Sequence, residues 1–432
     1  MYTIVTLIMF CLTIIVIWRR HHKSYVDLSL NYLWITPFLA LLSLIDHNLD
    51  HDKISPYIRI LPYILIMFTM GVSVRSSLLL RKSRSFWSGF SCLVVYAFLS
   101  WLQIFYAIRP DWAIVTWFWV VPGYILFFIA GYETPLSKLT QSKNALWVIL
   151  GFTSIGIFLR FYAIYIGRVD AAGFWYTRGY GSIYASGIVI IATYGGMAWL
   201  QIRDLSKYKF LFILLCLLTP FTSMSRSSIV ILFMFIALLF FPDDIHKFCL
   251  SYKNMLLGVL ASGILFLCVL FFIDTPLIVA ITSSWENRFQ GLATSFFDWG
   301  IRSMQVRFEE FGDIYQKVFE DYLFKGEGIG QYYFSSNTGY SDAHNLFFTE
   351  CYENGVLATL FLYALFFIGT FYACLGMFRP KMAPLSVSFL VCMLIVHTGG
   401  NTLIEKGFAQ YITPYAGWVF FFIIGRLISQ RA

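Results

Sequence analysis

The sequence predicts an all-α, polytopic integral membrane protein with about 12 or 13 transmembrane helices and a long extracytoplasmic helical loop. Of the 432 residues, 59% are hydrophobic and 12% are charged, and the mean hydropathy is +0.72. Soluble globular domains carry about 25% charged residues, so this composition excludes that class. The aromatic content of 20%, dominated by 45 Phe residues, suits aromatic belts at both membrane interfaces and faces for sugar stacking.

Apolar runs long enough to cross a bilayer recur along the chain. The first begins at Met1 without a basic n-region or a small-residue cleavage site, which predicts a membrane span and not a removed signal peptide. No internal repeat or linker interrupts the series, so we expect one membrane domain over residues 1–432. The expected spans lie at about residues 2–18, 26–45, 57–79, 86–107, 113–132, 145–165, 182–201, 210–224, 228–241, 255–273, 346–376, 385–400 and 412–427.

Basic residues divide the connections between these spans into two alternating sets. Because Lys and Arg accumulate in cytoplasmic connections, this alternation places the long segment at about residues 274–345 outside. The net charge of +8 is partly this topological signal and gives no reason to expect a nucleic-acid partner. The residues expected in the cytoplasm are Arg19, Arg20, Lys23, Arg81, Lys82, Arg84, Lys138, Lys143, Arg203, Lys207, Lys209, Lys247, Lys253, Arg379, Lys381, Arg426 and Arg431.

A polar stretch begins inside the long outer segment and runs from Arg302 to Gly355. Apolar residues recur there at steps of three or four between Met304 and Tyr322, which predicts an amphipathic helix. Arg307 lies at the edge of its apolar face. This side chain can serve a substrate, or its stem can lie along apolar surface while its charge reaches water. We expect the segment to form a helical cap over a cavity, since lipid cannot satisfy irregular backbone.

Two further elements follow this predicted helix. Gly326, Gly328 and Gly330 form a GxGxG pattern with no strand before it, on the side where ATP is scarce, so the pattern predicts a tight turn. His344 opens the next apolar run shortly after Asp342, which can cap the following helix. A solvent-reachable imidazole titrates near neutrality and suits general-base chemistry, although a histidine at a helix start can also be satisfied by backbone alone.

The order of these elements resembles the O-antigen ligase and O-antigen polymerase superfamily over about residues 222–356. Asn345 follows His344 directly, and Gly355 fits the glycine that follows the His-Asn pair in that superfamily. The sequence TSMSRS at 222–227 resembles the Ser-Arg element that opens the characteristic region. Arg226 in this element is expected at the outer membrane edge, where an arginine is costly unless it meets water, an anion or a carboxylate.

A separate spacing resembles the RX10G pattern of periplasmic loops in O-antigen polymerases. Arg168 and Gly179 enclose ten residues, and Arg178 adds a second charge. Two exposed loop cations are the alternative explanation. The same spacing does not recur after Arg288, Arg302 or Arg307, so the chain departs there from the polymerase pattern.

The resemblance implies a metal-independent glycosyltransferase of the bacterial inner membrane, with its active site facing the periplasm and with no cofactor. It would transfer a growing glycan from undecaprenyl pyrophosphate to the next lipid-linked repeat unit. His344 would act as the general base, and Arg307 and Arg226 would bind the pyrophosphate, since a guanidinium group grips phosphate oxygens in bidentate fashion. The expected substrate-binding residues are Arg168, Arg178, Gly179, Arg288, Arg302 and Asn345.

The expected partners are the undecaprenyl-pyrophosphate-linked donor and acceptor, membrane lipid and a chain-length regulator protein. Two alternatives stay open: an O-antigen ligase that delivers the glycan to lipid A-core, and a transporter or flippase whose arginines line a passage. The eight cysteines show no CxxC and no metal-ligand spacing, so we expect neither disulfides nor a metal. Arg160 and His397, toward outer span ends, are lower-ranked cavity candidates.

The alternation of basic residues gives a testable topology. Reporter fusions after Tyr208 and after Lys247 should report the cytoplasm, and a fusion near Ser336 should report the periplasm. A cytoplasmic signal at Ser336 would place the His344 and Arg307 segment on the wrong side for chemistry on a periplasmic glycan.

Overall fold

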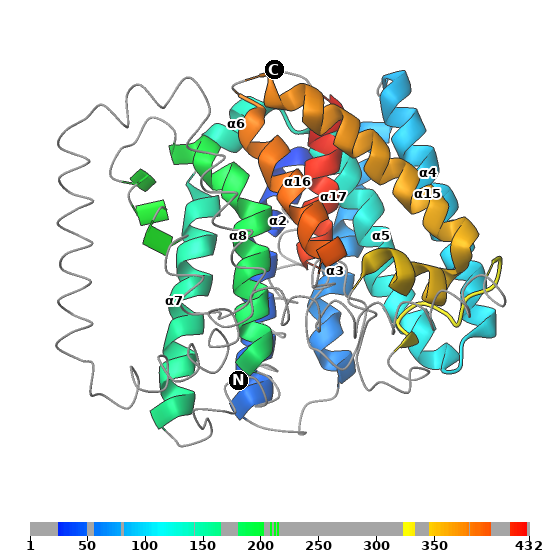
Figure 1. Cartoon of the computed structure of the whole chain (residues 1–432), viewed down its shortest axis with the longest axis horizontal. Coiled ribbons are helices and arrows are strands. Elements are labelled where there is room, and N and C mark those ends of the chain that lie inside the picture. The colour runs from blue at the N-terminus through cyan, green and yellow to red at the C-terminus, as the bar shows by residue number, and fades with distance from the viewer. Residues whose placement is uncertain are drawn as a thin grey trace, which may run out of the picture.

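The computed structural model describes the chain in twelve stretches, and all its regular elements there are helical (Figure 1). The described residues are 25–49, 56–78, 82–141, 143–165, 180–202, 208–209, 211–212, 214–215, 323–332, 345–379, 381–398 and 415–429. The helices are α2 (Tyr25–Leu49), α3 (Pro56–Leu78), α4 (Arg84–Leu102), the 3-10 helix η1 (Gln103–Tyr106), α5 (Pro110–Glu133), α6 (Leu136–Thr140), α7 (Asn144–Tyr165), α8 (Tyr180–Ile202), α15 (Leu346–Met377), α16 (Ala383–Thr398) and α17 (Tyr415–Ser429).

These helices agree with the predicted all-α membrane class. Each predicted apolar run from 26–45 to 182–201, and from 346–376 to 412–427, coincides with a helix to within a few residues. In the described part, the stretches long and apolar enough to cross a membrane are Arg84–Tyr106, Pro110–Glu133 and Leu346–Met377. The short helix α6 was not predicted. The runs at 2–18, 228–241 and 255–273 and most of 210–224 lie outside the described residues, so the total of 12 or 13 spans stays a prediction.

The core of the bundle is the close contact between α5 and α17. Small residues alternate with aromatic rings along this contact: Trp418 lies directly over Gly123 and donates its indole N–H to the Val120 carbonyl oxygen at 3.2 Å. Further along, Gly131 faces the Phe422 backbone and Gly425 faces the Phe128 backbone. Glycines allow two membrane helices to approach closely and gain dispersion contacts that lipid does not supply.

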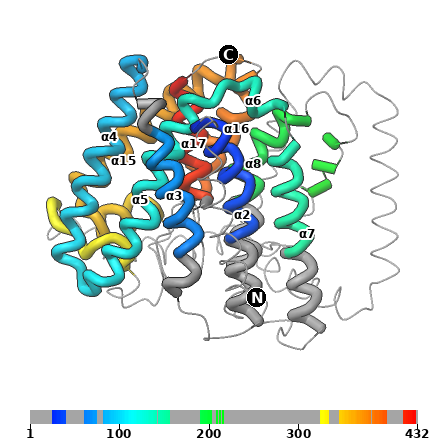
Figure 2. The backbone as a smooth tube through the Cα atoms, turned by 180° about the vertical axis from the view of Figure 1, so that it is seen from behind, coloured from blue at the N-terminus to red at the C-terminus, as the bar shows by residue number. Residues whose placement is uncertain are grey.

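The other helices surround this central pair. Figures 1 and 2 show α7 and α8 on one side of it and α4 and α15 on the other. Helix α16 packs between α8 and α15, and α3 packs on α5. The arrangement leaves α4 and α15 with many exposed apolar side chains, including Phe98 and Phe367, as expected for helices that face lipid.

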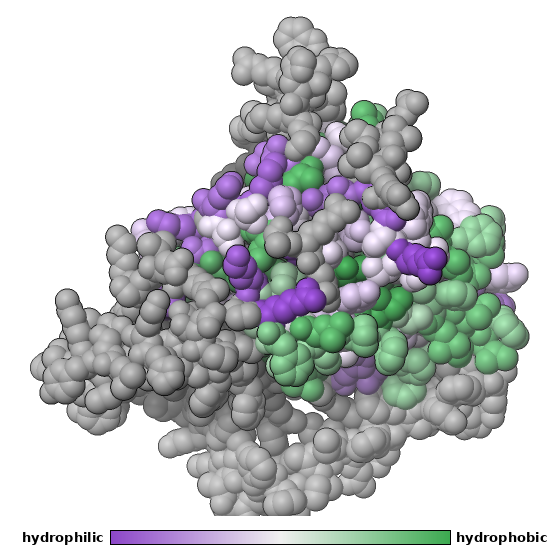
Figure 3. All heavy atoms as spheres, turned by 90° about the horizontal axis from the view of Figure 1, so that it is seen from above, coloured by the Kyte–Doolittle hydropathy of each residue, from purple (hydrophilic) through white to green (hydrophobic). Residues whose placement is uncertain are grey.

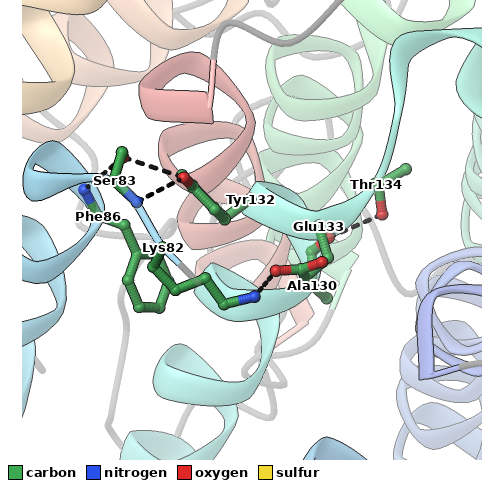
Figure 4. Close-up of polar contacts among 7 residues, drawn as sticks. All are labelled: Lys82, Ser83, Phe86, Ala130, Tyr132, Glu133 and Thr134. Atoms are coloured by element: carbon green, nitrogen blue, oxygen red, sulfur yellow. Dashed lines mark hydrogen bonds and ion pairs between the residues drawn. The ribbon is translucent and has the colours of Figure 1, made fainter. Parts of the chain in front are cut away.

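One end of the bundle is closed by a buried ion pair between Lys82 and Glu133 (Figure 4). Ser83 caps α4 by accepting the Phe86 N–H at 3.2 Å, and its hydroxyl also accepts the Tyr132 hydroxyl at 2.9 Å. The connection before α4 therefore meets the connection after α5. Both connections were predicted on the cytoplasmic side; the structure brings them to one end of the bundle, and the side that this end faces stays a prediction.

The same end also contains α6 and the ion pair between Lys138 of α6 and Asp27 of α2, at 2.5 Å. Seen from this end, hydrophilic side chains gather over the ends of the helices, and hydrophobic residues flank them (Figure 3). A polar end above apolar flanks is the distribution expected of a helical bundle whose sides face lipid and whose ends face water.

The close contact of α5 with α17 predicts unequal effects of two glycine substitutions. In Gly131→Ala the new methyl group would collide with the Phe422 carbonyl, so the helices must separate. Overpacking of this kind costs about 1–3 kcal/mol, and the melting temperature of the purified protein in detergent should fall. Gly71→Ala in α3 is the matched control because nothing lies within 4 Å of its Cβ position. Equal melting temperatures for the two variants would contradict the backbone contact.

Candidate functional site

Helix α15 is broken at Gly355, within the polar stretch that the sequence singles out. Gly355 has φ 77° and ψ 158°, a conformation essentially reserved for glycine. It separates a first leg, residues 346–354, from a second leg, residues 356–377. The ring of Phe347 meets the ring of Tyr363 at a centroid distance of 5.1 Å, whereas 16 residues of straight helix would separate them by about 24 Å. The first leg therefore turns back along the second.

This break corrects the prediction of one continuous span over 346–376. The polar residues Glu350, Glu353 and Asn354 precede Gly355, but the apolar residues on both sides keep the mean hydropathy of the run high, so hydropathy alone predicted one span. The predicted similarity placed Gly355 after the His-Asn pair, and the structure gives this residue a physical role as the point where the chain reverses.

The loop 323–332 supplies hydrogen bonds that the break removes from α15. Just before the break, the Tyr352 carbonyl oxygen accepts the Glu327 N–H at 2.9 Å, and the Glu353 carbonyl oxygen accepts the Gly328 N–H at 2.8 Å. In return, the Leu357 N–H donates to the Leu323 carbonyl oxygen at 3.2 Å. Backbone groups that are buried without partners are costly, above all in an apolar environment. The loop therefore makes the break in α15 tolerable.

The glycines of this loop form the tight turn that the sequence predicts. Gly328 and Gly330 have positive φ values of 98° and 74°, and the Gln331 N–H donates to the Gly328 carbonyl oxygen at 3.2 Å. Gly326 has no room for a side chain because its Cβ position would collide with the Glu353 carbonyl group. The GxGxG pattern thus brings the loop backbone against the break in α15.

Two buried glutamine side chains fasten the loop to the corner between α4 and α5. Gln103 accepts the Gly326 N–H at 2.8 Å and donates to the Phe324 carbonyl oxygen at 3.1 Å. Gln331 acts in the opposite direction: it accepts the Arg109 N–H at 2.9 Å and donates to the Arg109 carbonyl oxygen at 3.4 Å. The connection at 109–111 and the loop were both predicted outside, and they meet at one end of the bundle.

The first leg of α15 buries two carboxyl groups. Glu350 is fully buried and accepts the Tyr96 hydroxyl at 2.9 Å and the Asn354 amide at 2.8 Å. Glu353 is 2% exposed, and its carboxyl group accepts the Tyr332 N–H at 3.4 Å. Ionisable side chains within apolar helices are rare and mark functional or tightly bonded positions. Here they tie the first leg to α4 and to the loop.

Asn345 begins the first leg. Its side-chain oxygen accepts the N–H groups of Phe347 at 2.9 Å and Phe348 at 3.4 Å, so it is the N-cap. The sequence had suggested Asp342 for this role. The Asn345 amide also donates to the His397 carbonyl oxygen at 3.3 Å, which joins the start of α15 to the end of α16.

His397, a lower-ranked candidate in the sequence, lies beside this junction. Its Nδ1 atom is 2.6 Å from the Met393 carbonyl oxygen, which can only accept, so Nδ1 carries a proton. Its Nε2 atom is 2.7 Å from the Tyr363 hydroxyl. The imidazole is thus half-buried with its ring oriented by Met393 and Tyr363, while the backbone of His397 accepts the amide of Asn345, the residue that follows His344.

Of the predicted site residues, the structure describes Asn345. Its hydrogen bonds are to backbone groups of α15 and α16, and its substrate contact stays a prediction. Arg160, a lower-ranked candidate in the sequence, is a residue of helix α7. The predicted amphipathic helix at 304–322 and Asp342 lie outside the described residues, as do His344, Arg307, Arg226, Arg168, Arg178, Gly179, Arg288 and Arg302.

The sequence reasoning missed the residues that assemble this region. Glu350 and Glu353 could have been found, because two acidic residues inside a predicted span are unusual. Gln103 and Gln331 carried no signal, since an amide that bonds to backbone leaves no pattern in the sequence. Within the described ranges, no group of three His, Cys, Asp or Glu side chains is arranged to hold a metal ion. What these residues can do is hold a loop and a helix start in fixed positions.

The break in α15 predicts a specific sensitivity to substitution. Gly355→Ala forces a side chain into a strained backbone conformation, which costs about 1–3 kcal/mol, and places its Cβ 3.1 Å from the Phe324 carbonyl group. Gly369→Ala is the control on the same helix, where the nearest atoms belong to the Phe389 ring, which can move. Thermal unfolding should show a clear loss for Gly355→Ala and a smaller one for Gly369→Ala. The reverse order would argue against the break.

Known proteins offer no further guide to this region. Comparison with protein-family models, with curated proteins and with solved structures finds no match for this chain. The resemblance to the O-antigen ligase and polymerase superfamily therefore stays a prediction drawn from the residues themselves.

Proposed function

We propose that this protein is a membrane-embedded glycan polymerase that extends an O-antigen or a related surface polysaccharide at the periplasmic face of the inner membrane. The observation that carries the proposal is the meeting of two elements of the resemblance that are separate in sequence. The glycine loop at 326–330 hydrogen-bonds to α15 at the break marked by Gly355, the glycine that follows His344 and Asn345. Because the glycine loop and the break at Gly355 form one hydrogen-bonded unit, there is a physical reason for both elements of the resemblance to occur in one chain.

The proposed reaction joins two lipid-linked glycans. A hydroxyl oxygen on the acceptor repeat unit attacks the anomeric carbon of the donor glycan, and the bond from that carbon to the undecaprenyl-pyrophosphate oxygen breaks. The bonding electron pair leaves with the pyrophosphate, and His344 takes the proton of the attacking hydroxyl. Arg307 and Arg226 would stabilise the negative charge that builds on the leaving pyrophosphate, because planar guanidinium groups donate two hydrogen bonds at once.

The remaining site residues would bind the substrates. Arg168, Arg178 and Gly179 belong to the RX10G spacing and would meet one glycan, while Arg288 and Arg302 would add positive charge on the same outer side. The proposed partners are the lipid-linked donor and acceptor and a chain-length regulator protein. Buried carboxyl groups at Glu350 and Glu353 are bonded within the bundle and would support this arrangement without touching the pyrophosphate.

A ligase is the second candidate, and one observation favours it. The RX10G spacing does not recur in the long outer segment, and a ligase would use the same donor chemistry with lipid A-core as acceptor. Deletion of the gene distinguishes the candidates on a lipopolysaccharide gel. A single repeat unit on the core indicates a lost polymerase, and a bare core with polymer on the carrier lipid indicates a lost ligase. Loss of both products indicates a flippase.

The direct test is polymerisation by the purified protein on lipid-linked repeat units. Removal of a positioned general base costs roughly 10²–10⁴ in rate, so His344→Asn and His344→Ala should form no visible polymer at matched amounts of folded protein. Arg307→Lys and Arg226→Lys should also fail, because a lysine ammonium lacks the planar pair of donors.

Two control variants make the matching substitutions at positions that the sequence predicts on the cytoplasmic side. Arg379→Lys changes an exposed arginine at the end of α15, and His246→Asn changes a histidine in a predicted cytoplasmic connection. Both should retain wild-type turnover. Near-wild-type turnover by a His344 variant would remove His344 from the chemistry, and full activity of both arginine variants would refute bidentate binding.

A further inference from the structure

We infer that Tyr363 and His397 form a subsite for a sugar hydroxyl group, an inference that rests on the proposed function for the identity of the ligand. Tyr363 lies on the second leg of α15, and His397 lies near the end of α16. Both side chains are half-buried, and the Tyr363 hydroxyl is 2.7 Å from the His397 Nε2 atom. The pair therefore joins two helices through polar groups that are still partly open to a ligand.

The direction of each hydrogen bond in this group is set by Met393. Its carbonyl oxygen can only accept, so the His397 Nδ1 atom, 2.6 Å away, carries a proton. In the neutral imidazole the Nε2 atom then has a lone pair and no proton, and it accepts the Tyr363 O–H. The only hydrogen of the Tyr363 hydroxyl is thereby used. Toward a ligand, the Tyr363 oxygen can only accept a hydrogen bond.

An oxygen that can only accept selects the class of ligand that it binds. A sugar hydroxyl group, or the N–H of an acetamido group on a sugar, can donate to it. The ionised oxygens of a pyrophosphate diester carry no hydrogen, so they would face the Tyr363 oxygen lone pair against lone pair. The subsite therefore fits the glycan of a lipid-linked substrate and does not fit its pyrophosphate.

Aromatic rings hold the Tyr363 ring in place. Phe347 of the first leg meets it edge to face at a centroid distance of 5.1 Å, and Phe366 meets it at 5.4 Å. The imidazole of His397 is nearly perpendicular to it, at 5.5 Å. Ligand sites in proteins are lined mainly by apolar and aromatic side chains, with a few polar groups that fix the orientation of the ligand. Here the Tyr363 hydroxyl is the polar group that would orient a sugar.

The depth of the pair in the membrane also favours a polar ligand. Helix α16 has 16 residues and measures about 24 Å, against a hydrocarbon core of about 30 Å. The exposed residues Arg379 and Lys381 precede its start. With that end at the membrane surface, His397 falls within the thickness of the core, where the Asn345 amide donates to its carbonyl oxygen. Ionisable residues at such depth face the bundle interior or a water-filled cavity and mark substrate pathways.

The chain contains a matched control for the loss of one tyrosine hydroxyl. Tyr194 of α8 is fully buried and donates to the Leu33 carbonyl oxygen of α2 at 2.6 Å. Tyr194→Phe and Tyr363→Phe each remove a hydroxyl that donates to a neighbouring helix, and each keeps the aromatic ring. Both variants therefore lose a helix-to-helix bond, but only Tyr363→Phe removes an acceptor that a ligand can reach.

The experiment measures the binding of two probes to full-length protein in nanodiscs by thermophoresis. One probe is the lipid-linked repeat unit, and the other is undecaprenyl phosphate, which has the lipid and a phosphate but no sugar. Because one neutral hydrogen bond contributes modestly, Tyr363→Phe should bind the repeat unit about 3- to 10-fold more weakly than the wild type. It should bind undecaprenyl phosphate with unchanged affinity. Tyr194→Phe should bind both probes as the wild type does.

Three results would overturn the inference: unchanged affinity of Tyr363→Phe for the repeat unit, an equal loss of affinity for both probes, or the same loss in Tyr194→Phe. Hydroxyl-radical footprinting of the wild type gives a second measurement that needs no variant. The repeat unit should protect Tyr363 from oxidation, and undecaprenyl phosphate should not. A Tyr363 that the repeat unit leaves unprotected would also refute the subsite.

The proposed function is judged separately, by glycan transfer. The expected binding pattern without transfer by the wild type would refute the polymerase and leave the subsite in place. Transfer by the wild type together with normal repeat-unit binding by Tyr363→Phe would refute the subsite alone. A wild type that does not bind the repeat unit would refute both.

Discussion

The structure depends on the satisfaction of backbone hydrogen bonds where α15 reverses direction. An apolar bundle offers no water to an interrupted helix, so each freed N–H and carbonyl group needs a protein partner. Loop 323–332 supplies three of these bonds, and Gln103 holds the loop in place. The contact of α4 with α15, the burial of Glu350 and Glu353 and the course of the glycine loop all follow from this requirement.

The helices could be predicted from the sequence because each one is marked by a long run of apolar residues, and no single residue decides the prediction. A run of apolar residues has one stable solution in a membrane, and the ends of α2, α5 and α7 fall within a few residues of the runs that predicted them. The reversal in α15 could not be predicted in this way. Gly355 is a single residue in a long run, and its positive φ accompanies a loop, residues 323–332, that is distant from the run's centre and that no hydropathy pattern joins to it.

Only part of the candidate site could be predicted from the sequence. The tight turn at Gly328 and Gly330 follows from glycine chemistry, and the sequence predicted it. The helix start was placed correctly, but its cap is Asn345 and not Asp342, because only the observed φ and ψ values decide which polar residue precedes the first turn. The roles of Gln103 and Gln331 could not be predicted, since their partners are backbone groups more than 200 residues away in sequence.

The reversal at Gly355 also resolves a mismatch between helix length and bilayer thickness. A straight helix of 32 residues would measure about 48 Å, far longer than a hydrocarbon core of about 30 Å. The second leg alone, residues 356–377, measures about 33 Å and fits without strong tilt. The first leg, residues 346–354, measures about 14 Å and is too short to cross the hydrocarbon core by itself. One predicted span can therefore hold two helices and still correspond to a single crossing.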